Sequence, residues 1–524
     1  MISKTDFTDC DFGFSSFSGA RATGVIFTSV NLLNSDLRGI EASHAIFSKA
    51  ILSGSLLQNA HLNLAIMNDS TMDSADFSGA QAPGAFLTGA VLRNTKLTGV
   101  NLQSAKLTRT LLDGVDLSGA ILNESQLAAA DLSNTTFENT EFVGAGFTMT
   151  TSLPFTLDEA LNSKGMILIP RISSSGNTHS CNLDGGLHLR CWGSNNAGQL
   201  GVGDSLDRLS PTAVLLSESI IQFQASDLGH TCAVIESGKV YCWGINSSGQ
   251  LGIDGIARTE MPMQLKSLDR IRISQITTGP SHGCAVSEGG RVYCWGNNQS
   301  FQLGTGDDVI RRIPEEIFSL NNARQVAAGS RHTCAVTTEG KVYCWGTGPT
   351  GQLGLGAGIT VEKTPTVLSG FDSEVIQLAV KSTFSCALTK SGKVFCWGNG
   401  VSGQLGNGDN ASRYVPTLVT NLPSIVKHIF TGGSHACADT EFGDLYCWGS
   451  NTTGQLGLGD GSPANYFIPI LVNTLPSPVK YASLGINHTC AITSTDQTYC
   501  WGANTAGQLG IGSTQNQFSP TRVD

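Results

Sequence analysis

Large apolar residues recur at every fifth position over the first part of the chain. The series runs from Phe7 to Phe147, and every member is Leu, Phe or Met except Ala22, Ala42 and Ala82. The residue two positions before each member is compact. A period of five fits neither the 3.6 residues of a helical turn nor the alternation of a strand, so an amphipathic helix is excluded.

This pattern predicts a coil whose short sides each take five residues. The large residue points to the axis, the compact one fits the corner, and stacked coils bond backbone to backbone about 4.8 Å apart. With four sides to a coil, the repeats make about seven coils and a rod on the order of 35 Å long. The stretch resembles the pentapeptide-repeat family in units such as Ala75-Asp76-Phe77-Ser78-Gly79 and Ala130-Asp131-Leu132-Ser133-Asn134. The resemblance implies a right-handed quadrilateral β-solenoid over residues 1–150.

Both ends of such a rod expose unpaired strands that must be covered. Downstream, Thr156-Leu157-Asp158-Glu159 has the pattern of a capping box that opens a short helix ending near Gly165. We expect residues 151–170 to cap the last coil and to link the two domains. Only a few residues precede the first coil, so either the rod associates with a second molecule at its N-terminal end or the true start lies upstream.

A second repeat occupies residues 181–510. Each unit reads Cys, nine residues, Cys-Trp-Gly, and then a stretch close to Gly-Gln-Leu-Gly, and all seven tryptophans of the chain lie in these triplets. In Gly229–Gly252, two apolar runs flank Glu236-Ser237-Gly238, which has the pattern of a three-residue hairpin loop. Seven short-stranded units of nearly equal length predict a seven-bladed β-propeller over residues 171–524. The chain is therefore expected to be all-β.

The end of the chain predicts how this ring closes. Pro520–Val523 matches Pro211–Val214, yet no equivalent segment precedes the first unit. We expect the C-terminal strand to complete the first blade and close the propeller. The units resemble the regulator-of-chromosome-condensation repeat family in their His-Ser/Thr, Trp-Gly and Gly-Gln-Leu-Gly series, with Phe301 in place of a glycine in the third unit.

The paired cysteines of the units predict disulfides. In the hairpin closed by Ile235 and Lys239, Cys232 falls opposite Cys242 at a non-hydrogen-bonded site, where Cα atoms approach to about 4.5 Å and a disulfide fits. The alternative is that reduced cysteines fill the core. Seven bridges favour an extracytoplasmic or secreted location, whereas the absence of a signal-peptide pattern at the start keeps a cytoplasmic one open. The candidate pairs are Cys181/Cys191, Cys232/Cys242, Cys284/Cys294, Cys334/Cys344, Cys386/Cys396, Cys437/Cys447 and Cys490/Cys500, with Cys10 left unpaired.

No catalytic, metal or cofactor site is predicted. A histidine stands two residues before the first cysteine in six units, with Phe384 in its place in the fifth. One histidine and two cysteines are one ligand short of a zinc site, and the resembled propeller family carries such a histidine without the cysteines, so we interpret these histidines as structural. The chain has no phosphate-binding Gly-Lys-Ser/Thr, His-Glu-x-x-His or serine-elbow motif.

Charge and hydropathy argue against binding to nucleic acid and against a transmembrane segment. The net charge is −10 and neither half carries a basic stripe, which disfavours binding to nucleic-acid phosphates. No apolar run approaches the roughly 18 residues that span a bilayer, so no transmembrane segment is expected.

The leading functional interpretation is a non-enzymatic scaffold whose propeller loops bind a protein partner while the rod positions it. The loops between Gly-Gln-Leu-Gly and the following proline differ most between units, and Tyr466 and Phe467 are the aromatic pair best suited to an interface core. The candidate contact residues are Asp307, Asp308, Arg311, Arg312, Arg413, Tyr414, Tyr466 and Phe467.

Three other functions follow from the resemblances. The propeller resemblance implies guanine-nucleotide exchange on a small GTPase for some members, although the 50–53-residue cysteine spacing leaves no room for an inserted wedge. Other propellers of this type inhibit secreted enzymes through their loops. Some pentapeptide-repeat proteins act on topoisomerases as DNA mimics, but 8 basic and 14 acidic residues over residues 1–150 are a thin charge for that role.

Overall fold

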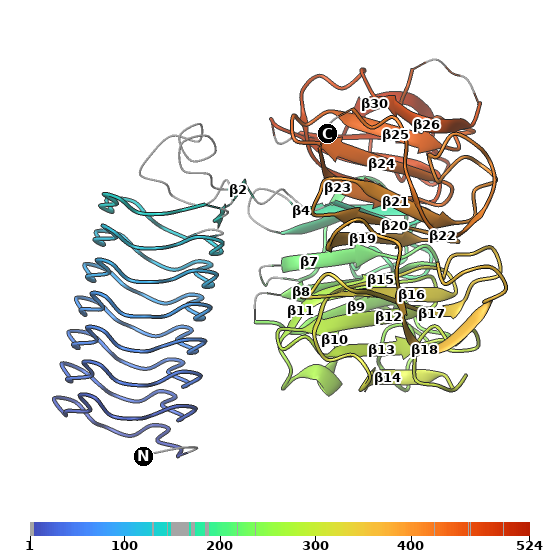
Figure 1. The fold of residues 1–524 in the computed structure, drawn as a ribbon. Helices are drawn as coiled ribbons and strands as arrows, with labels where there is room; N and C mark the ends of the chain where they lie inside the picture. The colour runs from blue at the N-terminus through green and yellow to red at the C-terminus, as the bar shows by residue number, and fades with distance from the viewer. Residues whose placement is uncertain are drawn as a thin grey trace. The chain divides into compact units, whose positions relative to one another are not determined.

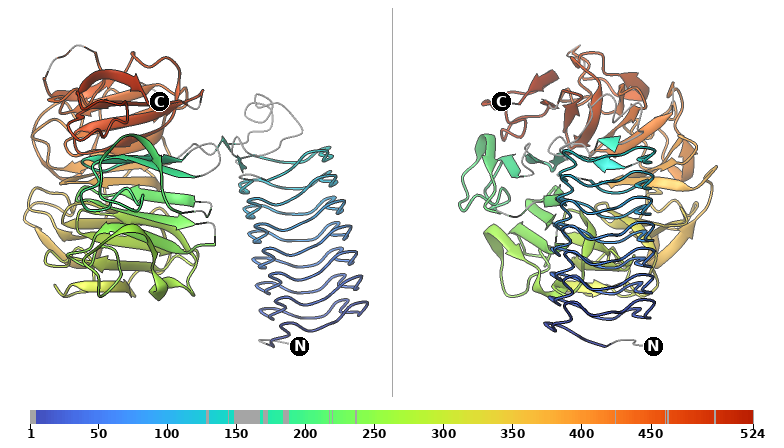
Figure 2. Two further views of the ribbon diagram at one scale, coloured as in Figure 1. Left: turned by 180° about the vertical axis from the view of Figure 1, so that it is seen from behind. Right: turned by 90° about the vertical axis from the view of Figure 1, so that its left-hand side faces the viewer.

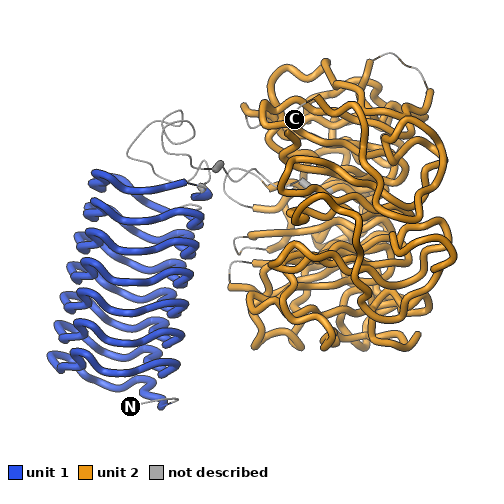
Figure 3. The backbone as a smooth tube through the Cα atoms, viewed as in Figure 1, with its two compact units in different colours: residues 1–170 blue, residues 171–524 orange. Residues whose placement is uncertain are grey.

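The fold is that of a computed structural model. It describes residues 5–147, 167–168 and 173–523 except for 128–129, 144, 184–187, 217, 219, 236, 424, 460, 462 and 496. The chain divides into two compact units, Met1–Pro170 and Arg171–Asp524 (Figure 3). Apart from the 3-10 helix η2 (Lys266–Leu268), the regular elements of the described residues are β-strands and bridges, so the all-β prediction is confirmed.

In the first unit, parallel bridges join each outward-facing residue to the one twenty positions later. The ladders begin with Asp6↔Ile26 and end with Gln126↔Gly146. One coil therefore takes twenty residues on four sides of five, and Figures 1 and 2 show the coils stacked as a solenoid. The right-handed turn of the coil stays a prediction. Past the last coil, β1 (Gly146–Phe147) pairs in parallel with β2 (Ile167–Leu168).

The period-five residues fill the solenoid core as the sequence predicted. Leu32, Leu52 and Ala60 are fully buried there. At several compact inward positions the residue is Ser or Thr, and its hydroxyl donates to a backbone carbonyl 23 residues earlier, as from Ser55 Oγ to Leu32 O at 2.6 Å and from Thr95 Oγ1 to Met72 O at 2.8 Å. Ser70 and Thr135 donate instead to the carbonyl three residues earlier. These hydrogen bonds offset the cost of burying the hydroxyl groups in the dry corner.

Aromatic rings fill the N-terminal end of the described coils. Phe7, Phe12 and Phe17 are half-buried, and neighbouring rings meet edge to face with centroids 5.4 Å apart. Phe7 stacks on Phe27 at 5.5 Å, which in turn stacks on Phe47 at 4.9 Å. Self-association at this end stays a prediction. The capping helix predicted near 156–165 lies outside the described residues.

Within the described residues, the second unit forms seven four-stranded antiparallel sheets arranged as the blades of a propeller (Figures 1 and 2), which confirms the predicted seven-bladed propeller. Blade one holds β3 (Ser173–Ser175), β4 (His179–Leu183), β5 (Leu189–Gly193) and β6 (Arg208–Ala213). Blade two holds β7 (Ile220–Ala225), β8 (His230–Ile235), β9 (Val240–Ile245) and β10 (Arg258–Gln264). Blade three holds β11 (Ile273–Thr278), β12 (His282–Ser287), β13 (Val292–Gly296) and β14 (Arg311–Glu316).

The remaining blades repeat this order. Blade four holds β15 (Ala323–Ala328), β16 (His332–Thr337), β17 (Val342–Thr347) and β18 (Val361–Leu368). Blade five holds β19 (Val375–Lys381), β20 (Phe384–Thr389), β21 (Val394–Gly398) and β22 (Arg413–Leu418). Blade six holds β23 (Val426–Thr431), β24 (His435–Thr440), β25 (Leu445–Gly449) and β26 (Tyr466–Leu471). Blade seven holds β27 (Val479–Leu484), β28 (His488–Thr493), β29 (Thr498–Gly502) and β30 (Gln517–Arg522).

The first strand of each blade is the inner one, because the first strands of neighbouring blades contact one another around the ring. The ring closes without an exchanged strand, so the prediction that the C-terminal strand completes the first blade is wrong. β30 pairs with β29 in blade seven, and blade one builds its own inner strand from Ser173–Ser175. Three serines carry no apolar alternation, so the sequence pattern did not reveal this strand. Bonds across the closing seam run between Ser175 Oγ and Ser483 Oγ (2.9 Å), from Asn182 Nδ2 to Thr498 Oγ1 (3.2 Å) and from Trp192 Nε1 to Gln508 O (2.9 Å).

Candidate interaction surface

Each blade carries one disulfide between its second and third strands. The two cysteines oppose each other in strand register, as Cys232 and Cys242 do, and their Cα atoms lie 4.1 Å apart. This is the pairing expected from the hairpin geometry, and Cys181–Cys191 shares it despite its displaced glycines. Among the described cysteines, Cys10 of the solenoid is the one outside these bonds. The other bonds are Cys284–Cys294, Cys334–Cys344, Cys386–Cys396, Cys437–Cys447 and Cys490–Cys500.

Each disulfide packs against the tryptophan of the next blade. Cys232–Cys242 of blade two shares an apolar cluster with Trp295 of blade three, and Cys490–Cys500 of blade seven shares one with Trp192 of blade one. Neighbouring residues of a strand point to opposite faces, so each Cys-Trp pair supplies both sides of the blade junctions. The indole N–H also crosses the junction, as Trp295 Nε1 donates to Gln250 O at 2.9 Å.

The blade histidines form a second set of bonds between blades. His282 Nε2 lies 3.0 Å from Thr333 Oγ1 of the next blade, and that hydroxyl donates to Gln302 O at 2.7 Å. Because the hydroxyl proton is already donated, the oxygen accepts from a histidine that carries its proton on Nε2. Two blades break the series. His230 bonds to Ser226 Oγ of its own blade at 2.7 Å, because the next blade carries Gly283 at the hydroxyl position. Phe384 packs with Ala436, which has no hydroxyl to bond. The other bonded pairs are His179–Thr231, His332–Ser385, His435–Thr489 and His488–Ser180.

Burial keeps these histidines neutral. Desolvation lowers the pKa of His332 to about 3 and that of His282 to about 4. The pKa values of the remaining four, His179, His230, His435 and His488, are likewise lowered to about 3 by burial. With the cysteines bonded to each other, no group of three or more His, Cys, Asp or Glu in the described chain could hold a metal ion. The histidines therefore belong to the scaffold.

An ion pair crosses the centre of the ring. Three residues before the blade histidine, five blades carry glycine, whereas blade two carries Asp227 and blade five carries Lys381. These two residues meet, with Lys381 Nζ 3.1 Å from Asp227 Oδ1 and side chains only 14% and 10% exposed. The same ammonium donates to Ser175 O at 2.7 Å and Leu484 O at 2.8 Å. Lys381 therefore joins blades two and five to both sides of the closing seam.

The charged residues of the predicted contact loops are held in local ion pairs. Arg311 Nη2 lies 2.8 Å from Asp307 Oδ2 and Arg413 Nη2 lies 2.6 Å from Asp409 Oδ2. The guanidinium of Arg311 lowers the pKa of Asp307, chiefly through their hydrogen bond. These residues shape the loop that leads into the outer strand. Arg311 and Arg312 begin β14 and Arg413 begins β22, so these arginines lie on outer strands and not in the predicted loops. Asp308 and Arg312 are exposed.

The predicted aromatic contacts lie on outer strands, so their placement in loops is corrected. Tyr414 is on β22, and Tyr466 and Phe467 begin β26. Tyr466 and Phe467 are half-buried. A Cβ added at Gly403 of the preceding blade would stand 2.8 Å from Phe467 Cδ1, so this ring covers a neighbouring turn. Phe467 therefore packs against blade five, and Tyr466 packs against the apolar cluster that contains Trp501 of blade seven. These two residues do not form an exposed aromatic pair.

A different apolar surface, missed by the sequence analysis, lies at the start of blade six. Ile425 is 57% exposed, and Phe442, at the tip of the hairpin that joins β24 to β25, is 70% exposed. Glu441 N bonds to Ile425 O at 3.1 Å, so the two segments are adjacent. Leu418 of β22 is 42% exposed nearby, at the same pocket as Ile425. We call Leu418, Leu422, Ile425 and Phe442 the blade-six patch.

Comparison of the blades shows what is unusual about this patch. The position of Ile425 is held by Arg272 in blade three and by Glu374 in blade five, and each forms an ion pair with its own hairpin, to Glu288 at 3.2 Å and to Lys390 at 3.4 Å. Blade six replaces that ion pair with an exposed isoleucine. The position of Phe442 is held in other blades by Ser237, Gly289, Glu339, Ser391 and Thr495. A comparison of hairpin tips across units would have revealed this signal.

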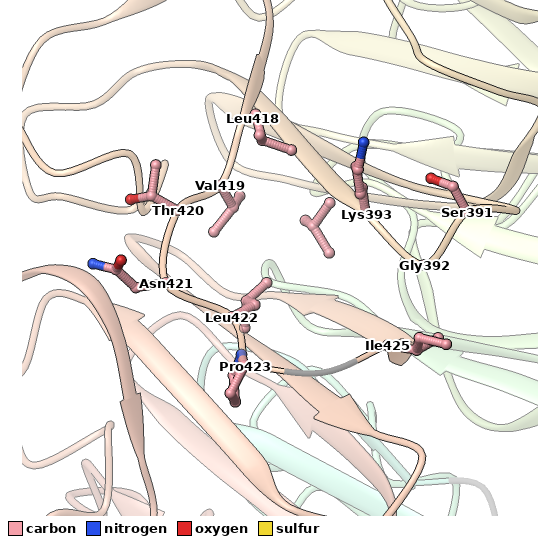
Figure 4. Close-up of a pocket in the computed structure, with 11 residues that line it drawn as sticks. Ser391, Gly392, Lys393, Leu418, Val419, Thr420, Asn421, Leu422, Pro423 and Ile425 are labelled. Carbon is pink, nitrogen blue, oxygen red and sulfur yellow. The ribbon is translucent and has the colours of Figure 1, made fainter.

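A pocket of about 520 Å³ opens beside Ile425, between blades five and six. It is lined by Val394, Leu418, Val419, Leu422 and Ile425 among others. Figure 4 shows Leu418, Val419, Leu422 and Ile425 arranged around the opening, with Lys393 at its rim. Apolar walls with a few polar groups at the rim suit a pocket that accepts an apolar side chain. In the part of the chain that the structure describes, no helix is long and apolar enough to cross a membrane.

Two kinds of repeat are recognised by comparison with known families. Pentapeptide repeats (8 copies) match residues 5–40, 45–80, 75–114 and 110–148. The regulator of chromosome condensation (RCC1) repeat matches residues 188–234 and 237–286 in one version and 220–250 and 273–302 in another. The RCC1-like domain matches residues 310–524.

Similar proteins share the propeller. The ultraviolet-B receptor UVR8 of Arabidopsis thaliana is 36% identical over 357 residues, 67% of this chain and 69% of the receptor. The probable E3 ubiquitin-protein ligase HERC4 of Homo sapiens is 39% identical over 291 residues, 54% of this chain, which spans only 27% of the ligase. The crystal structure of human WBSCR16 superposes with a TM-score of 0.58 and 25% identity, covering 64% of this chain and 92% of that one.

Proposed function

Because the chain belongs to the pentapeptide-repeat family in its first unit and to the regulator-of-chromosome-condensation repeat family in its second, we propose that it is a non-enzymatic protein-interaction scaffold. The propeller binds a protein partner through the blade-six patch, and the solenoid positions the complex. The observation that carries this proposal is the exposure of Ile425 at an apolar pocket and of Phe442 on the adjacent hairpin.

The rest of the propeller supports a scaffold more than a reaction centre. Its six blade histidines are fully buried, five of them are bonded from blade to blade, and its cysteines are bonded to each other. Residues repeated once in each blade build a ring, whereas a reaction centre needs a set of groups that occurs once. The blade-six patch, like the Lys381–Asp227 ion pair, departs from the repeat, and unlike that ion pair it is exposed. Exposed aromatic and aliphatic side chains beside a pocket are typical of the centre of a protein interface.

The names of the similar proteins do not extend this proposal. The chain spans about a quarter of the HERC4 ligase, so that protein's activity is not carried over. UVR8 is named as a light receptor, and nothing in the blade-six patch depends on light absorption. We therefore limit the proposal to binding of a protein that presents an apolar side chain to the pocket.

The proposal is tested by capturing partners from extracts of the native host on the immobilised full chain. Phe442→Ser and Ile425→Ser remove the patch. Phe318→Ser is the matched control, because Phe318 is also an exposed phenylalanine (82%) on a propeller loop of another blade. A partner retained by the wild type and by Phe318→Ser but lost with both patch variants supports the proposal. Equal retention by all four proteins contradicts it.

A further inference from the structure

One outer face of the solenoid carries a ladder of large apolar residues. Ile26, Ile46, Ile66 and Phe86 are joined rung to rung by parallel bridges, so their side chains project from the same side of successive coils. All four are half-buried, because each packs beside its neighbours along the ladder and keeps its outer surface open. None is among the inward-facing residues that form the solenoid core.

The equivalent positions on two other faces are mostly polar. One of these faces carries Asp36, Asp76 and Asp116 along its ladder, and the next carries Glu41 and Gln81. The same backbone therefore accepts charged and polar residues at this position without harm to the core. Folding does not require isoleucine and phenylalanine on the outside, and a contiguous apolar stripe on a surface marks an interaction site.

Opposite charges mark the two ends of this ladder. Asp6 forms the first rung, next to Ile26, and Lys106 forms the sixth, next to Phe86. Lys106 Nζ lies 4.9 Å from the centre of the Phe86 ring. Five rungs of about 4.8 Å separate Asp6 from Lys106 by roughly 24 Å, more than twice the screening length at physiological salt. The two charges therefore do not pair with each other within one chain.

We propose that this face binds the same face of a second copy of the chain in an antiparallel arrangement. A two-fold axis between the rungs of Ile46 and Ile66 brings Asp6 of each copy opposite Lys106 of the other, and the four apolar rungs of one copy face those of the other. The acid-to-base order of the ladder selects this antiparallel register, because a parallel pairing places like charges opposite each other.

The flanks of the ladder permit close approach. The corner residues on one side are Thr28, Ser48, Asn68 and Thr88, and those on the other include Gly24 and Gly84. Leu64, at that second corner, is 44% exposed and widens the stripe in the middle of the ladder. His44, like Leu64, is exposed at the second corner, so on that side the two larger residues lie between Gly24 and Gly84 along the ladder.

The size of the face sets the expected affinity of the dimer. The six rungs from Asp6 to Lys106 make it roughly 24 Å long at about 4.8 Å a step. Two such faces bury on the order of 1,000 Å² in total, near the lower limit for a specific complex. The dimer is therefore weak and forms at micromolar concentrations. It uses the side of the solenoid, so it differs from an association of open N-terminal ends, and it does not depend on the blade-six patch.

The test is sedimentation equilibrium of the full chain across a range of concentrations. Asp6→Lys and Lys106→Asp are each expected to raise the dimer dissociation constant by roughly tenfold, and the double swap is expected to restore it to near the wild-type value. Ile66→Lys is expected to abolish the dimer. Gln81→Lys, which adds the same charge at the equivalent position of another face, is the control and leaves the dimer unchanged.

Each variant is first shown to melt as the wild type does. If Ile66→Lys does not fold, the exchange of Asp6 and Lys106 still decides the question, because it leaves the apolar rungs in place. Rescue by the double swap supports the antiparallel dimer. A wild type that stays monomeric at several hundred micromolar, a double swap without rescue, or a Gln81→Lys variant as defective as Ile66→Lys overturns it.

Discussion

Lys381 and Asp227 form a nearly buried ion pair across the centre of the propeller, although 154 residues separate them in the sequence, with Nζ and Oδ1 3.1 Å apart. They replace the glycines found at this position in the other five blades. The same lysine binds carbonyl oxygens of Ser175 in blade one and Leu484 in blade seven. Since no strand is exchanged between those blades, the lysine acts as a brace across the closing seam.

The first prediction concerns this brace. Lys381→Gly leaves the Asp227 carboxylate without its cation in a site where it is 10% exposed, and loss of one member of such a pair costs about 3–5 kcal/mol of unfolding free energy. Lys381→Gly/Asp227→Gly, which restores the residue of the other five blades, is expected to cost less than either single change. Thermal unfolding of the wild type, the two single variants and the double variant measures these losses of stability. Additive losses in the double variant would show that the two side chains act independently.

The second prediction concerns the bonds between histidine and hydroxyl. Ser385→Ala leaves the Nε2 proton of His332 without its acceptor, and a buried unpaired donor costs about 1–3 kcal/mol. His332→Phe/Ser385→Ala recreates the apolar pair that Phe384 and Ala436 already form between blades five and six. We expect the double variant to be more stable than Ser385→Ala in chemical denaturation. A double variant less stable than the single one contradicts the bonding scheme.

The third prediction is a loss of stability in acid. Six blade histidines have folded pKa values lowered to about 3 or 4 by burial, whereas in the unfolded chain they titrate near 6.5. Between those values the unfolded chain binds more protons, so stability is present above pH 6.5 and falls as the pH drops toward 4. Each histidine contributes up to about 1.4 kcal/mol per pH unit.

The melting temperature measured from pH 7.5 to 4.5 checks this slope. His332→Phe/Ser385→Ala removes one titrating group, so its profile is expected to be shallower than that of the wild type by one proton. An unchanged profile would assign the acid sensitivity to other groups.

The fourth prediction concerns the cysteines. Protein isolated without reductant and unfolded in the presence of a thiol reagent is expected to show one free thiol, that of Cys10, because the other fourteen cysteines are paired. Each bridge closes a short loop with a separation of 10 residues and contributes about 2–3 kcal/mol by the chain-entropy relation. Cys334→Ala/Cys344→Ala is expected to lower the melting temperature, whereas Cys10→Ala is not. Fifteen reactive thiols would contradict the pairing.

Periodicity made most of the fold predictable. A five-residue period requires coil sides of five residues to keep residues such as Leu32 and Leu52 inside, and the bridges between residues twenty apart show that a coil has four of them. Seven units of nearly equal length predicted the seven blades. The hairpin turn fixed the register of Cys232 against Cys242, since register follows from loop length. The prediction failed where the sequence carries no hydrophobic pattern. The strand Ser173–Ser175 has no alternation of apolar and polar residues, so the C-terminal strand was wrongly assigned to the first blade.

The candidate site was less predictable, because it depends on which blades are neighbours. Phe467 was expected to be an exposed contact, but its ring covers the turn at Gly403 of the adjacent blade. Lys381 and Asp227 stood out in the sequence only as departures from glycine, and their pairing across the ring requires the closed propeller. Ile425 and Phe442 were also departures, visible only when equivalent positions of the blades are compared.

The most direct measurement of the proposed function places a photo-crosslinking amino acid at position 442 of the full chain, with position 318 as the control. Both sites are exposed phenylalanines of the propeller, 70% and 82% respectively, in different blades. Irradiation in cells of the native host is expected to join one discrete protein to position 442 and not to position 318, and Ile425→Ser is expected to abolish that product. The same products from both positions, or none from position 442, would contradict a binding surface on blade six.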